Sequence, residues 1–350
     1  MQNLPDIGEI PEPPKIPPVP EGAERPLFSV MIPVCNRTKY LRQALESVLH
    51  ENYPPDQMQI CIVDNSTETI DWEVFLSPKE RQRIEIFRQS EHVGMAENWN
   101  TCISQSRGHL VHILHDDDWI LPGFYDEIKR LESLNSTAAL LATRNIFLDT
   151  HDIWTGISPI LKTTGKTFTN LEEFFFTNPI QCPAIVIKRK FYEKHGGFLT
   201  SLKHTLDWEL WHRAIKTCGG VVSDKVLSFY RMHDSNDTSI AIQTASNLKD
   251  RLKCMLIFQK INQEYPFLDG VKSIIRETEI QENILIAKGN LVGANLNRDF
   301  RDFCVTTFGL EKQISFQQQH GHSLKAQFRQ ILGTMKRRVL SKFNQCKATC

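Results

Sequence analysis

The first third of the chain alternates short apolar runs with segments whose apolar residues recur at helical spacing. This pattern predicts four strands separated by helices: strands at residues 28–33, 59–64, 84–87 and 110–114, and helices at 40–50 and 94–106. Such alternation is typical of an α/β fold, a mostly parallel sheet flanked by helices. Sheets of this kind bind ligands beyond the carboxyl ends of their strands.

The later pattern divides the chain into further parts. After an expected strand near residues 138–147 the sequence is irregular, until a predicted helix at 206–217 and a strand at 221–230. From about residue 240 the periodicity is almost wholly helical. Eight of the 17 prolines lie before residue 27, a composition that favours an extended arm. We therefore predict a flexible leader (1–26), an α/β domain (27–240) and a helical extension (241–350).

Composition narrows the class of protein. The 41 basic and 41 acidic residues balance, which excludes a globally basic nucleic-acid binder. The nine cysteines form no CxxC pair, as in a reduced cytoplasmic protein. The last 30 residues hold seven Lys and Arg, no acid, and apolar residues at helical spacing. This segment either lies on an anionic membrane surface, on the inner face of the membrane, or packs on its own domain with a solvated basic face.

An acidic tract offers the clearest chemistry. The apolar strand ending at Leu114 runs into Asp116, Asp117 and Asp118, and Pro122 follows. Three adjacent carboxylates repel one another unless a cation offsets their charge. Oxygen ligands suit Mg²⁺ or Mn²⁺, which commonly bridge carboxylates and the phosphates of a nucleotide. The alternative is a solvated turn whose Asp residues cap the next helix.

Two other strand ends carry polar residues. The first strand leads into the loop Pro33–Arg37, whose backbone amides and polar side chains can face a nucleotide. The second strand ends at Asp64, where a carboxylate can bind a base or ribose, or else cap a helix.

These segments resemble the inverting family-2 glycosyltransferases, which have the GT-A fold and use nucleotide sugars. The resemblance rests on Ser29–Arg37, Val63–Glu68 and His92–Asn100, in this order before the acidic tract, and it extends over about 200 residues. It implies that Asp64 binds the base and that Pro33, Asn36 and Arg37 lie near the nucleotide. It also implies that Gly94 and Asn98 shape the pocket beneath the phosphates.

The resemblance makes the acidic tract a metal motif of the DxD type. Its spacing to Pro122 indicates Asp117 as the principal ligand, while a second frame uses Asp116 and Asp118. His115 stands where the family commonly has its first acid. Further along, Tyr230–His233 resembles a strand end whose Arg231 and His233 lie over the diphosphate, and His233 is also expected in the metal set with Asp117 and Asp118.

The catalytic residue implied by the resemblance is Asp207. Residues 206–213 resemble the helix that carries the family's general base, and residues 194–198 resemble the glycine turn before the acceptor site. Trp208 and Trp211 provide apolar surroundings that raise the pKa of a carboxyl group. The structural alternative for Asp207 is an N-terminal helix cap.

The implied reaction is inverting transfer of a sugar to a glycan or lipid-linked acceptor, as in surface polysaccharide assembly. Two other functions remain open. A nucleotidyltransferase normally has a Gly-rich phosphate loop, and residues 33–37 contain no Gly. A catalytically inert nucleotide-sugar-binding protein fits His115 in the metal motif, but not the joint presence of Asp207, Arg231 and His233.

Overall fold

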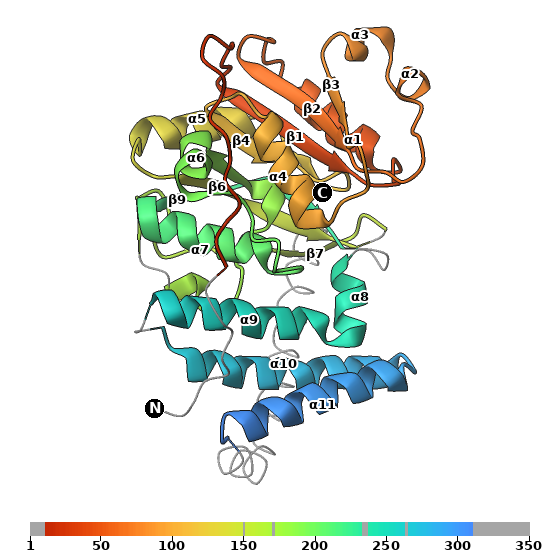
Figure 1. Cartoon of the computed structure of the whole chain (residues 1–350), viewed down its shortest axis with the longest axis vertical. Coiled ribbons are helices and arrows are strands. Elements are labelled where there is room, and N and C mark those ends of the chain that lie inside the picture. The colour runs from red at the N-terminus through yellow and green to blue at the C-terminus, as the bar shows by residue number, and fades with distance from the viewer. Residues whose placement is uncertain (1–10, 150, 170–171, 233–236, 263–264, 311–350) are drawn as a thin grey trace, which may run out of the picture.

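The structure is a computed structural model that describes residues 11–149, 151–169, 172–232, 237–262 and 265–310. Figure 1 shows a twisted sheet with helices on its faces, above stacked layers of helices from the last part of the described chain. The α/β class predicted from the alternating pattern is confirmed.

The sheet has nine strands in the order β3-β2-β1-β4-β8-β6-β9-β5, with β7 paired to β6. Strands β3, β2, β1 and β4 are mutually parallel, as are β6 and β9, whereas β8 runs antiparallel between β4 and β6. The strands are β1 (Phe28–Val34), β2 (Met58–Asp64), β3 (Glu85–Arg88), β4 (Leu110–Ile113), β5 (Trp119–Ile120), β6 (Leu140–Leu148), β7 (Trp154–Ile157), β8 (Ile185–Lys188) and β9 (Gly220–Arg231).

The α/β domain surrounds this sheet with short helices. They are α1 (Leu41–Leu49), α2 (Trp72–Phe75), α3 (Pro78–Arg81), α4 (Met95–Gln105), α5 (Phe124–Leu134), α6 (Arg189–His195) and α7 (Leu206–Cys218), with 3₁₀ turns η1 (Glu172–Phe174) and η2 (Cys182–Ala184). Side chains of β1 alternate between two cores, because successive residues of a strand point to opposite faces. Val30 and Ile32 pack with α1 and α5, whereas Met31 belongs to the core that contains α4 and α7.

The helical extension, as described, consists of α8 (Asp237–Thr244), α9 (Ser246–Ile261), α10 (Phe267–Ala287) and α11 (Leu291–Thr307). Met255 and Phe258 of α9 belong to the same core as Trp208 of α7, so the extension and the α/β domain share buried apolar surface. No helix among the described residues is long and apolar enough to cross a membrane. The basic segment in the last 30 residues lies outside the described residues.

Residues 11–26, the described part of the predicted proline-rich leader, pack against the domain. Ile16 is buried in the core that contains α4 and α7. The amide of Gly197 donates to the carbonyl of Pro14 (2.9 Å), and Arg189 Nη2 donates to that of Pro17 (2.9 Å). Residues 11–26 therefore differ from a free, flexible leader, because one apolar side chain and two carbonyls have partners in the domain.

Candidate active site

A cavity of about 1160 Å³ lies at the carboxyl ends of β1 and β4, next to the start of α7. Its walls also include Asn247 and Arg251 of α9 and Glu277 of α10. The structure brings together at this cavity nine residues of the predicted site: Pro33, Asn36, Arg37, Gly94, Asn98, Asp116, Asp117, Asp207 and Arg231. Among the described residues of that prediction, Asp64 and Asp118 lie outside the lining, and His233 lies outside the described residues.

The loop after β1 is tied to the acidic tract. Arg37 Nη2 lies 2.6 Å from Asp116 Oδ1 and 2.8 Å from Asp117 Oδ2, and Arg37 Nε donates to Asp116 Oδ2 at 3.2 Å. Burial lowers the pKa of Arg37, but its bonds to the two carboxylates raise that pKa by more. In the structure Arg37, predicted as a nucleotide contact, therefore neutralises part of the acidic tract.

The loop's own shape depends on Asn36. Its backbone has φ 55°, in the left-handed region that Asn adopts more readily than most residues. Its side-chain oxygen accepts from the amide of Thr67 (2.8 Å), and its own amide donates to Ser66 Oγ (2.9 Å). Asn36 thus joins the loop after β1 to the loop after β2.

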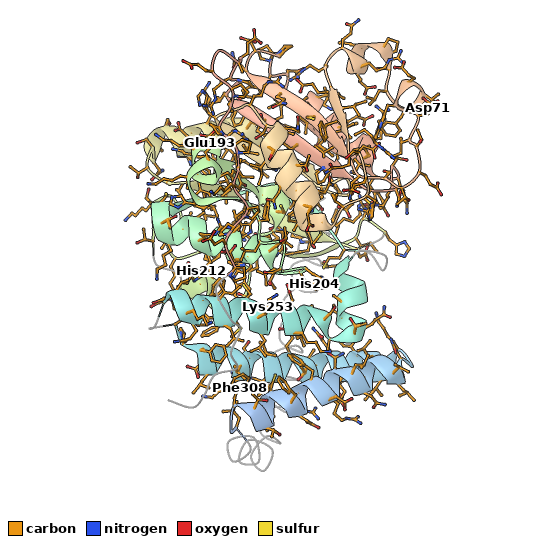
Figure 2. All side chains as sticks on the ribbon, viewed as in Figure 1. Asp71, Glu193, His204, His212, Lys253 and Phe308 are labelled. Carbon is orange, nitrogen blue, oxygen red and sulfur yellow. The ribbon has the colours of Figure 1, made fainter. Side chains whose placement is uncertain are left out.

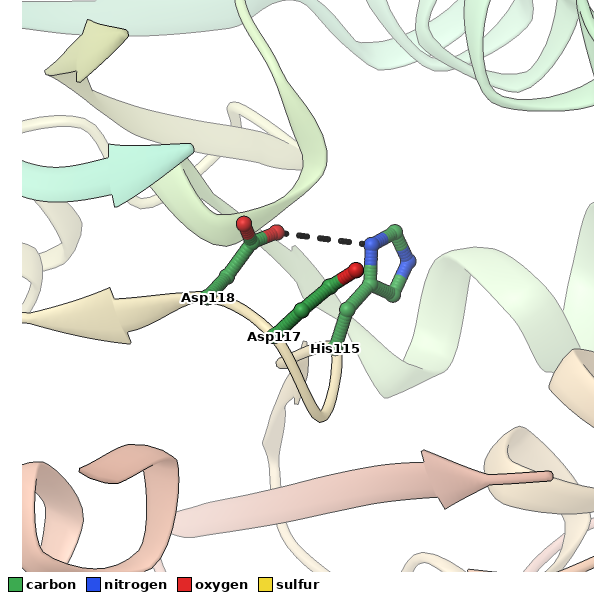
Figure 3. Close-up of side chains that lie close together, drawn as sticks. All are labelled: His115, Asp117 and Asp118. Carbon is green, nitrogen blue, oxygen red and sulfur yellow. Dashed lines mark ion pairs between the residues drawn. The ribbon is translucent and has the colours of Figure 1, made fainter. Parts of the chain in front are cut away.

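Three side chains of the acidic tract form a compact group of metal-ligand type. Figure 3 shows His115 and Asp118 facing each other with Asp117 beside them, and His115 Nδ1 lies 3.5 Å from Asp118 Oδ2. One ligand atom from each of the three lies within 4.8 Å of the others. Two of the residues predicted as metal ligands, Asp117 and Asp118, belong to this group, and His115 is a further member.

The donor set fits a divalent cation. His115 Nε2 is buried and has no hydrogen-bond partner among the described residues, and buried Asp118 Oδ2 makes no hydrogen bond there beyond its 3.5 Å ion pair with His115 Nδ1. Burial also raises the pKa of Asp116 and that of Asp118, so holding both as carboxylates costs free energy. A bound cation offsets this cost. Mg²⁺ strongly prefers oxygen ligands, whereas Mn²⁺ is a transition metal for which an imidazole nitrogen is a more acceptable ligand.

Arg231, the last residue of β9, forms hydrogen bonds with the acidic tract. Its backbone amide donates to Asp118 Oδ1 (2.9 Å) and its Nε to the carbonyl of Asp117 (3.2 Å). Its guanidinium lies over the rings of Tyr40 and Trp119, 4.1 and 4.9 Å from their centroids, and bonds to Asp152 and Gln43. The side chain is buried and lines the cavity, so it fixes the acidic loop and contributes positive charge beside it.

Asp64 lies at the expected strand end, but its carboxylate has protein partners. Oδ2 accepts from Arg88 (2.6 Å) and from the indole of Trp72 (3.1 Å), and Oδ1 accepts from the amide of Ser66 (2.9 Å). Burial tends to raise the pKa of Asp64, but these bonds lower it overall. In the structure Asp64 therefore organises the loop after β2 and caps no helix.

The neighbouring Asn65 reaches the cavity instead. Its amide forms two bonds with the backbone of Val93, each 2.9 Å, and so fixes the segment that precedes α4. Asn65, Gly94 and Asn98 all line the cavity. Sequence reasoning missed Asn65, although its position beside Asp64 at a strand end was an available signal.

Asp207 lies in the first turn of α7, and its carboxylate lines the cavity. Oδ2 accepts from Asn178 Nδ2 (2.8 Å) and Oδ1 from the amide of Trp208 (2.7 Å). Burial raises the pKa of Asp207 to about 6, against the lowering effect of these hydrogen bonds. The N-cap of α7 is Thr205, so Asp207 is not the cap residue itself. A carboxyl group with this pKa can accept a proton near neutral pH.

Two other cavity residues were not anticipated. Asn178 orients Asp207, and Arg251 pairs with Glu277 and with the carbonyl of Phe176. Asn178 lies within the irregular stretch and Arg251 follows the predicted domain, so no local pattern distinguished either. Only the folded chain brings α9 and α10 to the cavity.

Comparison with known proteins agrees with this geometry. Residues 29–196 match the model of glycosyl transferase family 2. An uncharacterized protein of Mycobacterium tuberculosis is 23% identical over 66% of this chain and 75% of its own length. An uncharacterized glycosyltransferase of Rickettsia typhi is 24% identical over 62% of this chain and 67% of its own.

Solved structures show the same fold at low identity. S. aureus TarS 1-349 in complex with UDP-GlcNAc has a TM-score of 0.57 at 15% identity, covering 82% of this chain and 91% of that one. A longer TarS structure has a TM-score of 0.52 at 17% identity, and the match covers 71% of this chain but only 42% of that one.

The parallel β3-β2-β1-β4 block, the acidic loop after β4 and the cavity beside them define a glycosyltransferase domain of the GT-A fold. The segment formed by residues 29–196 matches glycosyl transferase family 2.

Proposed function

We propose that this chain is an inverting, metal-dependent glycosyltransferase that moves a sugar from a nucleoside diphosphate donor to a hydroxyl group of a glycan or lipid-linked acceptor. One observation carries the proposal: Asp207, whose pKa is raised to about 6, lines the same cavity as His115 and Asp117 of the candidate metal group. A proton acceptor and a candidate cation site are the two groups that this displacement requires.

In this proposal Asp207 accepts the proton of the acceptor hydroxyl as that oxygen attacks the anomeric carbon from the face opposite the diphosphate. The bond from the anomeric carbon to the phosphate oxygen breaks, and inversion follows. Asn178 holds the carboxylate of Asp207 in place with a 2.8 Å hydrogen bond. Mn²⁺ or Mg²⁺, held by His115, Asp117 and Asp118, would neutralise charge on the departing diphosphate.

The donor in this proposal is a uridine diphosphate sugar. TarS, which has the same fold, has been solved with UDP-GlcNAc. Pro33, Asn36 and Asn65 line the cavity at the ends of β1 and β2, which is where nucleotides bind in sheets of this kind. Surface polysaccharide assembly is the process that such a transferase would serve.

The test is a donor survey. Purified protein is incubated with each common nucleotide sugar and Mn²⁺ or Mg²⁺, and released nucleoside diphosphate is measured with and without EDTA. We expect release from one donor that EDTA abolishes and that Asp207→Asn reduces at least hundredfold. The matched control is Asp299→Asn, an exposed acid on α11. Release that is equal in Asp207→Asn and in the control would contradict the proposal.

A catalytically inert nucleotide-sugar-binding protein is the second candidate. The bonds from Arg37 to Asp116 and Asp117 favour it, because they neutralise acids that an active enzyme presents to a cation. Binding of one nucleotide sugar with no turnover, even with candidate acceptors present, would identify this function.

A further inference from the structure

One face of α9 contacts the loop that leads into α7. The residues on this face recur at helical spacing and contact residues 201–205: Ser246, Asp250, Lys253 and Cys254. Lys253 Nζ donates to the carbonyl of Ser201 (2.7 Å), and Ser246 Oγ lies 3.2 Å from His204 Nε2. Figure 2 labels His204 and Lys253 in this region between α7 and α9.

Asp250 makes the central contact of this face. Its Oδ2 accepts from the amides of His204 and Thr205, each at 2.8 Å, and from that of Lys203 at 3.1 Å. It also accepts from the hydroxyl of Thr205 at 2.8 Å. A carboxylate that accepts from several successive amides holds that backbone strongly, since charge-assisted hydrogen bonds are about twice as strong as neutral ones.

This anchor lies immediately before the first turn of α7. Thr205 occupies the N-cap position, where its side chain makes no capping bond to α7 and its hydroxyl donates to Asp250. The first turn of α7 therefore takes its position from α9. Asp207 lies two residues after Thr205, within that turn.

We propose that Asp250 is a positioning residue for catalysis, which fixes the start of α7 and so the direction in which Asp207 presents its carboxylate to the cavity. The inference rests on the proposed role of Asp207 as the base. Asp250 does not line the cavity and touches no reacting atom, so it acts through the backbone of residues 203–205. Arg251 and Asn247, from the same helix, line the cavity directly. The helical extension is thereby part of the catalytic apparatus.

The experiment compares Asp250→Asn, Asp250→Glu and the control Asp299→Asn in the full chain. Two quantities are measured: amide hydrogen exchange of residues 201–209 without substrate, and steady-state kcat and KM with the donor found in the survey. In Asp250→Asn, the amides of 203–205 should exchange at least tenfold faster, because a neutral amide oxygen accepts more weakly than a carboxylate and the new NH2 group would face the amide of Lys203, which donates to Oδ1 in the wild type. We expect kcat to fall at least tenfold while nucleotide affinity, measured by calorimetry, stays within about twofold of wild type.

Partial recovery of kcat in Asp250→Glu, which keeps the carboxylate, would support positioning. Two results would overturn it: faster exchange with an unchanged kcat, or equal losses of kcat, nucleotide affinity and melting temperature, which would indicate a purely structural role. Wild-type protein that never turns over any donor would count against the proposed function alone. In that case the exchange measurement still tests the inference about Asp250. If the amides of residues 203–205 exchange at the wild-type rate in Asp250→Asn, Asp250 does not anchor this backbone and the inference is wrong.

Discussion

Arg37 Nη2 lies 2.6 Å from Asp116 Oδ1, which joins the loop after β1 to the loop after β4. The same nitrogen lies 2.8 Å from Asp117, a residue of the candidate metal group. The guanidinium therefore supplies positive charge at a carboxylate to which, in the proposed function, a divalent cation would bind. In the proposed function, Arg37 and a bound metal would act on the same carboxylate, that of Asp117.

Replacement of Arg37 by Gln should tighten Mn²⁺ binding about fivefold, because one positive charge next to Asp117 is removed and a partly exposed pair contributes only about 1 kcal/mol. Calorimetric titration of Mn²⁺ into the nucleotide-free protein measures this change. Arg42→Gln is the control, since Arg42 pairs with Glu80 and does not line the cavity. An unchanged Mn²⁺ affinity in Arg37→Gln would show that Arg37 and the metal do not compete.

The pH dependence of turnover should report Asp207. A general base must be deprotonated, and burial raises the pKa of Asp207 to about 6. Turnover should therefore reach its maximum well above pH 6 and fall tenfold per pH unit well below pH 6. A catalytic acid would give the opposite dependence, with turnover falling as the pH rises. A kcat profile at saturating donor and metal measures the acid limb. A limb at the ordinary carboxyl value near 4 would contradict the burial of this group.

His115 should control which cation is preferred. His115→Ala should weaken Mn²⁺ binding about tenfold or more, since a ligand is lost. His115→Asp should shift the preference toward Mg²⁺, because an oxygen replaces a nitrogen ligand. Competition between the two cations, followed by the electron paramagnetic resonance signal of free Mn²⁺, measures both effects. Identical cation preference in all three proteins would remove His115 from the ligand set.

The proline-rich arm should contribute to stability through Ile16. Its side chain is 5% exposed, and a buried Ile→Ala change costs about 2–4 kcal/mol. The free energy of unfolding, from urea titration, should fall by about that amount in Ile16→Ala. Val19→Ala is the matched control, because Val19 is only partly buried and the expected loss is below about 1 kcal/mol. Equal losses in the two variants would mean that the arm is not held by Ile16.

The sequence alone was sufficient to predict the strands that have strong local patterns. The strands β1, β2 and β4 were predicted to within a few residues, because largely apolar runs mark buried strands. The four-residue strand β8 was not foreseen, since it lies in an irregular stretch and pairs with strands distant in the sequence.

The residues of the candidate site also fall into those that the sequence predicted and those that it did not. Residues at strand ends, such as Asn36 and Asp116, were brought to one cavity as expected. The partners of Asp64 were not predictable, because Trp72 and Arg88 are eight and 24 residues away and only side-chain packing brings them together. The role of Arg37 depended on a loop 79 residues further along the chain.

The antiparallel strand β8 has a consequence for synthesis of the chain. The parallel block β3-β2-β1-β4 is complete at residue 113, but the free edge of β4 is covered only by residues 185–188. While the ribosome adds the intervening residues, the backbone N–H and C=O groups on this edge of β4 have no partner strand and can form hydrogen bonds with other chains. Slow translation before residue 188 should therefore increase aggregation of the nascent protein, and a chaperone that shields this edge should raise its yield.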